Sequence, residues 1–213
     1  MATAYLCDFD GTVAPHDIGA SLVRRFARGH EPELREALAR WKAGEIGHRE
    51  LTEIECRSMT VTEDEAVAFT RGFALDPEFG PFARAARARG DRVMVVSEGF
   101  DFYIRHRLAA AGLAEIPWTA NRARFEGVTV VPEFPHHDPA CRICGNCKGR
   151  HVRDQQAAGH RVVFVGDGFS DRCGARAADV VVARDDLLTW CLGQGIAARR
   201  FEGFAALADA VAA

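Results

Sequence analysis

The feature that most constrains the fold is a set of four short, continuously apolar segments that recur along the chain. They are residues 4–9 (AYLCDF), 92–96 (RVMVV), 161–165 (RVVFV) and 179–183 (DVVVA). Uninterrupted apolar character is typical of strands covered on both faces, because a half-exposed strand alternates apolar and polar residues. A helical pattern follows each segment, and this strand–helix alternation predicts a parallel, doubly wound α/β sheet.

The remaining segments of this alternation are expected to be helical. Helices are predicted at residues 79–89, 101–112, 147–158, 170–178, 185–193 and 203–212. Several end at a glycine, which suits the end of a helix. Residues 114–146 are expected to hold a short hairpin around RFEGVTVV, followed by a loop rich in proline, histidine and cysteine.

Residues 14–75 break the alternation, because four amphipathic helical stretches follow one another there. They are predicted at 17–28, 31–43, 47–58 and 62–73. The acids of TEDE at 62–65 suit the first turn of the last one. We therefore expect a core domain of residues 1–13 and 76–213, with a helical domain of residues 14–75 inserted after the first strand. Trp41, Phe69 and Phe73 fit core positions of that bundle.

Composition excludes several classes of protein. The chain has 213 residues, of which 48% are hydrophobic, and a formal net charge of −3. This charge argues against a nucleic-acid partner, which usually requires a basic surface. No apolar run reaches the ~18 residues of a membrane-spanning helix, and no signal peptide is apparent. We expect a cytoplasmic protein, monomeric or homodimeric, whose seven cysteines are reduced.

Polar side chains follow the main strands at the point where each strand ends. They are Asp8, Asp10, Ser97, Asp167 and Asp171, and Lys148 opens a predicted helix. In open α/β sheets, ligands bind outside the carboxyl ends of the strands. Acids, a hydroxyl and a lysine gathered there suit a cation and an anion together, and Mg²⁺ with a phosphate group fits both. The cation would relieve the repulsion between Asp8 and Asp10.

The same residues carry a resemblance to a known family. DFDGT at 8–12, Ser97, Lys148 and GDGFSD at 166–171 resemble, in order, the four motifs of haloacid dehalogenase-superfamily phosphatases. A helical insertion after the first motif resembles the phosphoserine-phosphatase branch, subfamily IB. Three longer segments look like the group that includes the methionine-salvage phosphatase acting on 2-hydroxy-3-keto-5-methylthiopentenyl-1-phosphate. They are VVSEGFDFYI, CGNCKG and GDGFSDRCGARAADVVVARDDLLTWC.

The resemblance implies a Rossmann-like core with a C1-type cap, and a Mg²⁺-dependent phosphomonoesterase acting on a small phosphorylated metabolite. Asp8 would be the nucleophile and would form an aspartyl-phosphate. Asp10 would protonate the leaving alkoxide and then activate water, which predicts a pKa above the usual ~3.9 of Asp. Asp8, the backbone carbonyl of Asp10 and Asp167 would hold the metal.

Further roles follow from the same resemblance, with alternatives for some of them. Thr12, Ser97, Glu98 and Lys148 would bind the phosphoryl group. Ser97 and Asp171 each also suit a simple helix cap. Asp171 would otherwise orient Lys148 or hold a metal-bound water.

Three positions are candidates for substrate specificity. The carboxylate of Glu98 could face the substrate, or point to solvent and leave only its backbone N–H in use. Asp17 and Arg57 could contact the substrate, or form an ion pair on the surface of the inserted domain.

One further motif lies beside Lys148. Cys141-x2-Cys144-x2-Cys147 has nearly the spacing of a zinc site, and His136, His137 and His151 are near in sequence. Three thiolates and a histidine would make a closed structural site. A reduced cysteine-rich loop or an oxidisable pair of thiols are the alternatives.

Other substrates and other functions remain open at this point. Phosphoserine, phosphocholine, phosphoethanolamine or an intermediate of a specialised pathway are alternative substrates. A phosphomutase would share the DxD motif. A phospho-receiver domain would carry its acceptor aspartate on a later strand and would have no insertion. A catalytically silent relative is disfavoured, because each of the four motifs is present.

Overall fold

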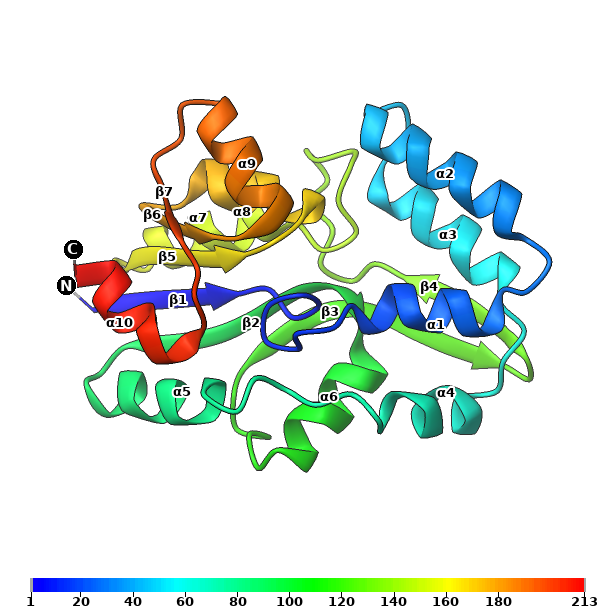
Figure 1. Ribbon diagram of the computed structural model, residues 1–213, viewed down its shortest axis with the longest axis horizontal. Coiled ribbons are helices and arrows are strands. Elements are labelled where there is room, and N and C mark those ends of the chain that lie inside the picture. Colours follow the sequence, from blue (N-terminus) through cyan, green and yellow to red (C-terminus); the bar gives the residue numbers. More distant parts are fainter. Residues whose placement is uncertain (1, 213) are drawn as a thin grey trace.

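The computed structural model describes residues 2–212, and a seven-stranded sheet forms its centre (Figure 1). The strands are β1 (Thr3–Cys7), β2 (Arg92–Phe100), β3 (Trp118–Glu126), β4 (Thr129–Glu133), β5 (Arg161–Gly166), β6 (Val180–Ala183) and β7 (Ala198–Arg200). Their order across the sheet is β4-β3-β2-β1-β5-β6-β7. Neighbouring strands are parallel, except that β3 and β4 form an antiparallel hairpin. The predicted doubly wound α/β sheet is confirmed, with one antiparallel edge.

Helices cover both faces of this sheet (Figure 1). On one side lie α5 (Phe79–Ala88), α6 (Asp101–Ala110) and α10 (Phe204–Ala212); on the other lie α7 (Lys148–Ala157), α8 (Arg172–Ala177) and α9 (Asp185–Gly193). Along β1, Tyr5 and Cys7 pack with the first group, whereas Ala4 and Leu6 pack with the second. Both faces are therefore buried, which explains why β1 is apolar without alternation.

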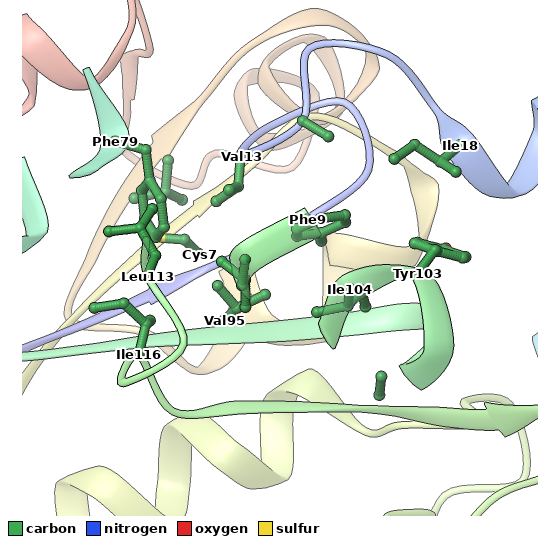
Figure 2. Close-up of a cluster of buried hydrophobic side chains, with 14 of the residues drawn as sticks. Cys7, Phe9, Val13, Ile18, Phe79, Val95, Tyr103, Ile104, Leu113 and Ile116 are labelled. Carbon is green, nitrogen blue, oxygen red and sulfur yellow. The ribbon is translucent and has the colours of Figure 1, made fainter. Parts of the chain in front are cut away.

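The loop after β1 is anchored by the residue between its two acids. Phe9 is fully buried and lies with Cys7, Val13 and Tyr103 in one apolar cluster (Figure 2). The ring centroids of Phe9 and Tyr103 are 6.0 Å apart. Burying a phenylalanine side chain stabilises a fold by about 2 kcal/mol. This anchor holds Asp8 and Asp10 at the carboxyl end of β1.

Four helices, here called the insertion, lie between β1 and β2 in the chain. They are α1 (Ile18–Phe26), α2 (Glu31–Ala43), α3 (His48–Ser58) and α4 (Glu63–Thr70), close to the predicted ranges. At the start of α4, Thr62 and Glu65 form the reciprocal hydrogen bonds of a capping box. The insertion meets the rest of the molecule at the hairpin, where the Val61 N–H donates to the Val128 carbonyl at 2.9 Å.

The sheet also contains strand segments that the sequence did not predict. β3 starts at Trp118, well before the expected hairpin, and pairs in parallel with β2 through Trp118 and Thr119. β7 is only three residues long and contains two arginines. Neither segment is a continuous apolar run, so neither produced the signal of a doubly buried strand. Among residues 2–212, no helix combines the length and the apolar character needed to cross a membrane.

Candidate active site

Asp8, Lys148 and Asp171 form a buried chain of charges at the carboxyl ends of β1 and β5. Lys148 is fully buried, and its Nζ lies 2.6 Å from Asp8 Oδ1 and 2.6 Å from Asp171 Oδ1. Burial lowers the pKa of Lys148, but the charges of Asp171 and Asp8 outweigh it and raise the pKa above its usual value. Lys148 is therefore a fixed ammonium group held between two carboxylates.

Asp171 is oriented by the backbone as well as by Lys148. Its Oδ2 accepts the N–H groups of Asp167 and Gly168, each at 3.0 Å. Both of its oxygens are thus occupied by donors from the loop after β5 and from Lys148. Of the roles expected for Asp171, this geometry favours orientation of Lys148.

Asp167 approaches the same group from the loop after β5. Thr12 Oγ1 donates to Asp167 Oδ1 at 2.7 Å. One carboxylate oxygen from each of Asp8, Asp167 and Asp171 lies within 4.8 Å of the other two. Burial first, and then the charge of Asp171, raise the pKa of Asp167 to about 6. Three acids this close to one another require a positive partner.

The turn at Gly11 makes this approach sterically feasible. Gly11 has a φ of +84°, and a Cβ atom there would collide with the carboxylate of Asp167. Only glycine has both the left-handed conformation at low cost and the missing side chain that the contact requires. The Gly of DFDGT is thus explained by the position of Asp167.

Asp10 has a different environment from Asp8, although only Phe9 separates them. Its Oδ2 accepts the Tyr103 hydroxyl at 2.6 Å, and its Oδ1 accepts the Ile18 N–H at 2.8 Å. Burial first, and then the charge of Asp17, raise the pKa of Asp10 to about 7, against the opposing effect of these hydrogen bonds. The expected rise in the pKa of Asp10 is confirmed. Near neutral pH this carboxyl group can both give and take a proton.

Ser97 lies at the bend of β2 and is fully buried. Its Oγ accepts the Gly99 N–H at 2.9 Å, and its carbonyl accepts the side-chain amide of Asn146 at 2.8 Å. Ser97 lines the cavity described below together with Asp8, and Lys148 contacts Asp8 from the start of α7. Gly99 has no room for a side chain, because a Cβ would overlap the Tyr103 hydroxyl that binds Asp10.

Glu98 is buried beside the cavity described below. It is 6% exposed, so of the two alternatives for its side chain, the one that points to solvent is wrong. Its Oε2 lies 2.6 Å from His48 Nδ1, at the start of α3, and its Oε1 accepts the Gly145 N–H at 3.1 Å. Glu98 thus links β2 to the insertion and to the loop before α7. Oε1 is held by the Gly145 N–H and Oε2 faces the His48 ring, while the residue also lines this cavity.

A cavity of about 360 Å³ opens between these residues and the insertion. Asp8, Asp10, Ser97, Glu98 and Asp167 line it from the core. From the insertion, apolar and polar side chains line it together: Leu22, Val23, Leu38, Trp41, Leu51 and Met59, with Asp17, Lys42, His48, Thr52 and Glu55. The cavity therefore has an acidic floor and a wall that contains both apolar and charged side chains.

Of the two further candidates for substrate specificity, Asp17 lines this cavity and Arg57 does not. Asp17 lines it and also caps α1, where its carboxylate accepts the Ala20 N–H at 2.7 Å. Arg57 is exposed and lines a separate hollow between α2 and α3, so a contact between Arg57 and a ligand in the cavity is not supported.

Of the three aromatic residues predicted to lie in the core of the helical bundle, two pack as predicted and Trp41 does so in part. Phe69 and Phe73 pack against the main apolar cluster as predicted. Trp41 packs partly against the small cluster between α2 and α3, but it also lines the cavity and stacks near Phe169 of the core.

Comparison of this sequence with known proteins shows which family the chain belongs to. Residues 5–176 match the model of the haloacid dehalogenase-like hydrolases. The chain belongs to this family. A 2-hydroxy-3-keto-5-methylthiopentenyl-1-phosphate phosphatase of Exiguobacterium sibiricum is 32% identical to it, covering 98% of this chain and 96% of that protein. The protein of that name from Brevibacillus brevis is 30% identical, covering 85% of this chain and 82% of the relative.

Solved structures show the same fold at lower identity. A substrate-bound phosphoserine phosphatase complex superimposes with a TM-score of 0.72 at 16% identity, covering 98% of each chain. Together with the family match and the named relatives, this fold identifies the chain as a haloacid dehalogenase-like hydrolase of phosphoric monoesters.

The acidic floor of this hydrolase fits a divalent cation. When ionised, Asp8, Asp167 and Asp171 carry three negative charges, and Lys148 offsets one of them. Among residues 2–212, the hydrogen bonds of Asp8 and of Asp167 use Oδ1 in each case, which leaves Oδ2 for another partner. Carboxylate oxygens with a surplus of about two negative charges suit a hard divalent ion such as Mg²⁺.

Sequence reasoning missed several residues that support the hydrolase site. Tyr103 binds Asp10, His48 pairs with Glu98, and Asn121 donates its amide to the Glu98 carbonyl at 2.6 Å. Of these, only Tyr103 had a local signal, because it lies in the first turn of the helix that directly follows β2. The other two come from elements brought together only by tertiary packing.

Proposed function

We propose that this hydrolase is a Mg²⁺-dependent phosphomonoesterase that works through an aspartyl-phosphate on Asp8. One observation carries the proposal: two carboxyl groups with different environments line one cavity. Asp8 is held against the ammonium group of Lys148, at 2.6 Å, whereas Asp10 has a pKa of about 7 and a tyrosine partner. A nucleophile needs the first environment and a general acid–base needs the second.

In the proposed reaction, an Asp8 carboxylate oxygen bonds to phosphorus while the bond from phosphorus to the leaving oxygen breaks. Asp10 gives its proton to that oxygen. Asp10, now a carboxylate, takes a proton from the water that hydrolyses the aspartyl-phosphate. Lys148 and Ser97 bind the phosphoryl oxygens, where negative charge gathers in the transition state. Thr12 joins them when its hydroxyl proton turns from Asp167 Oδ1 to the phosphoryl group.

We propose that Asp8, Asp167 and the backbone carbonyl of Asp10 hold Mg²⁺, with Asp171 orienting Lys148. The mutual proximity of the carboxylates and their raised pKa values support this metal set. Bound Mg²⁺ would neutralise charge on the transferring phosphoryl group. Thorough chelation is expected to abolish turnover and added Mg²⁺ to restore it, and unchanged rates after chelation would contradict the metal role.

We further propose that residues 14–75 act as a cap over a core of residues 1–13 and 76–213. The cavity supports this division, because its floor comes from strand ends and its wall from α1, α2 and α3. At about 360 Å³ it suits a small metabolite.

As the substrate we propose 2-hydroxy-3-keto-5-methylthiopentenyl-1-phosphate. The names of the relatives at 30–32% identity support it. The apolar side chains of the wall, Leu22, Val23, Leu51 and Met59, also suit a methylthio chain. Phosphoserine needs a cation for its carboxylate and an anion for its amine, and Lys42, Asp17 and Glu55 also line the cavity. The names of the relatives therefore carry the choice between the two esters. The phosphoserine phosphatases among the structural neighbours are 16–18% identical and share only the fold.

A ranking of kcat/KM over a panel of esters tests the substrate. The panel contains the methylthio ester, phosphoserine, phosphocholine, phosphoethanolamine and p-nitrophenyl phosphate. We expect the methylthio ester to lead the other metabolites by at least about tenfold, since the apolar side chains of the wall contribute only when an apolar chain contacts them. A higher kcat/KM for phosphoserine would overturn the substrate but not the reaction.

A further inference from the structure

Four cysteine sulfurs gather beside the active site, outside the cavity. The Sγ atoms of Cys141, Cys144 and Cys147 lie within 4.8 Å of one another. Cys173, at the start of α8, brings a fourth sulfur, which lies 3.6 Å from Cys144 Sγ. The neighbouring thiols of Cys144 and Cys173 lower the pKa of Cys147. The sequence motif supplied three of these residues, and the packing of α7 against α8 supplies the fourth.

The spacing of the sulfurs approaches that of a single tetrahedral ion. Zinc–sulfur bonds of about 2.3 Å place the sulfurs of a tetrahedron about 3.8 Å apart. The Cys144–Cys173 separation of 3.6 Å is close to that edge, and the sulfurs of Cys141, Cys144 and Cys147 lie within 4.8 Å of one another. Cys173 is outside that group of three, so one ion bound by all four sulfurs requires Cys173 Sγ to approach at least one further sulfur. A disulfide between Cys144 and Cys173 would use two of the sulfurs and leave the convergence of the other two unexplained.

One backbone N–H group points at a sulfur of the cluster. The Cys144 N–H donates to Cys141 Sγ at 3.5 Å. Such a donor favours the thiolate over the thiol, and the thiolate is the form that binds zinc.

Histidine does not complete the set, unlike in the considered site of three thiolates and a histidine. Among residues 2–212, no histidine nitrogen joins the group of three sulfurs within 4.8 Å, and His151 Nε2 lies 2.6 Å from Asn146 Oδ1, in the network around Ser97. Four sulfur ligands leave no open coordination position, which is typical of a structural site. Cys144 and Cys147 are 6% and 3% exposed, so the site is closed on its inner side.

We propose that Cys141, Cys144, Cys147 and Cys173 bind one structural Zn²⁺. The ion would connect the loop before α7 to the start of α8. Lys148 follows Cys147 directly and Asp171 lies two residues before Cys173, so the same ion fixes the two backbones that carry the Lys148–Asp171 pair.

The loop also reaches the insertion. The Ile143 carbonyl accepts the His48 N–H at 2.8 Å, and the Gly145 N–H binds Glu98. The zinc site would thus hold together the contacts that surround Ser97 and Glu98, without touching the substrate.

The metal content of the protein tests this proposal directly. The full chain is purified without a histidine tag and under reducing conditions, and zinc is measured by mass spectrometry. We expect about one zinc per chain, with an X-ray absorption spectrum that shows four sulfurs at about 2.3 Å. Cys173→Ala and Cys141→Ala are each expected to lower the retained zinc at least about tenfold. Cys191→Ala, a fully buried cysteine outside the cluster, is the matched control and should retain it.

Several results would overturn the zinc site. They are less than about a tenth of an equivalent of zinc in the wild-type protein, iron in its place, or a nitrogen ligand in the absorption spectrum. Zinc retained in full by both cluster variants would do the same. The wild-type measurements decide the question even where a variant fails to fold. These measurements do not depend on turnover. The phosphatase proposal can therefore fail while the zinc site stands, and the zinc site can fail while the phosphatase proposal stands.

Discussion

At the residue scale, one buried side chain allows two neighbouring acids to have different chemistry. Phe9 is fully buried, while Asp8 pairs with Lys148 and Asp10 with Tyr103. Each acid is desolvated, yet the first faces an ammonium group and the second faces a neutral hydroxyl. The apolar residue of the DxD pattern, Phe9, therefore anchors the loop and keeps its two acidic neighbours in these separate environments.

The replacement Asp8→Asn tests the nucleophile. We expect kcat on p-nitrophenyl phosphate to fall at least about a thousandfold, because an amide oxygen is a poor nucleophile for phosphorus. The fold should persist, since Lys148 keeps its 2.6 Å contact with Asp171. Thermal unfolding serves as the check on folding. A variant that keeps a tenth of wild-type turnover would show that Asp8 is not the nucleophile.

Gly11→Ala tests the contact between the first turn and Asp167. The added Cβ would collide with the Asp167 carboxylate, and we expect the Mg²⁺ concentration for half-maximal activity to rise at least about tenfold. Gly29→Ala is the matched control, because Gly29 has a similar φ of +88° and no neighbouring atom within 4 Å. Both changes carry the same backbone strain, of about 1 kcal/mol. An equal response to Mg²⁺ in the two variants would contradict the proposed role of Gly11.

At the scale of elements, the sequence predicts best what is local. β1, β5 and β6 were predictable because burial on both faces removes polar alternation, and Asp8, Asp10 and Asp167 because they follow strand ends. Tyr103 reaches Asp10 across 93 positions of sequence, and Cys173 reaches Cys144 across 29. Such contacts depend on how α6 and α8 pack against other elements. The periodicity of a single sequence does not show this packing.

The ion pair between α3 and β2 gives a pH-dependent link between elements. Burial lowers the pKa of His48, but the charge of Glu98 at 2.6 Å outweighs it and raises the pKa above its usual ~6.5. Since the folded pKa is the higher one, the stabilisation is complete below the unfolded pKa. It is lost as the pH rises through the folded value.

Glu98→Gln is therefore expected to cost more stability at pH 6 than at pH 9. We expect a loss of about 2 kcal/mol in the free energy of unfolding at pH 6, shrinking at pH 9, measured by urea denaturation. Glu115→Gln is the control, because Glu115 pairs with Arg87 at an exposed site and arginine stays charged over this range. A loss for Glu98→Gln that is the same at both pH values would exclude the charged pair.

At the scale of the whole molecule, the insertion joins the core through the main apolar cluster, which includes Met59 and Val61, and through aromatic and polar contacts beside the cavity. Trp41 of α2 lies 4.5 Å, between ring centroids, from Phe169 of the core, and 5.4 Å from His48. His48 in turn contacts Glu98 and the loop at Ile143. On the far side, Arg107 of α6 donates to the Arg71 carbonyl at 3.0 Å. In the proposed role of a cap, the contacts beside the cavity would part to admit a small ester and close to exclude water, while the apolar cluster keeps the insertion attached.

Trp41→Ala tests whether this closure limits the size of the substrate. In the wild-type protein we expect kcat/KM for a phosphoserine peptide to be at least about a thousandfold below that for p-nitrophenyl phosphate, because the peptide cannot fit under the closed cap. Removing the indole breaks the aromatic contact with Phe169. We expect KM for the small ester to rise about tenfold and the discrimination against the peptide to shrink. Trp41→Phe keeps an aromatic ring at the contact and should behave like the wild type. If Trp41→Ala lowers kcat/KM for both substrates by the same factor, the insertion does not select by size, and the contact serves only to stabilise the fold.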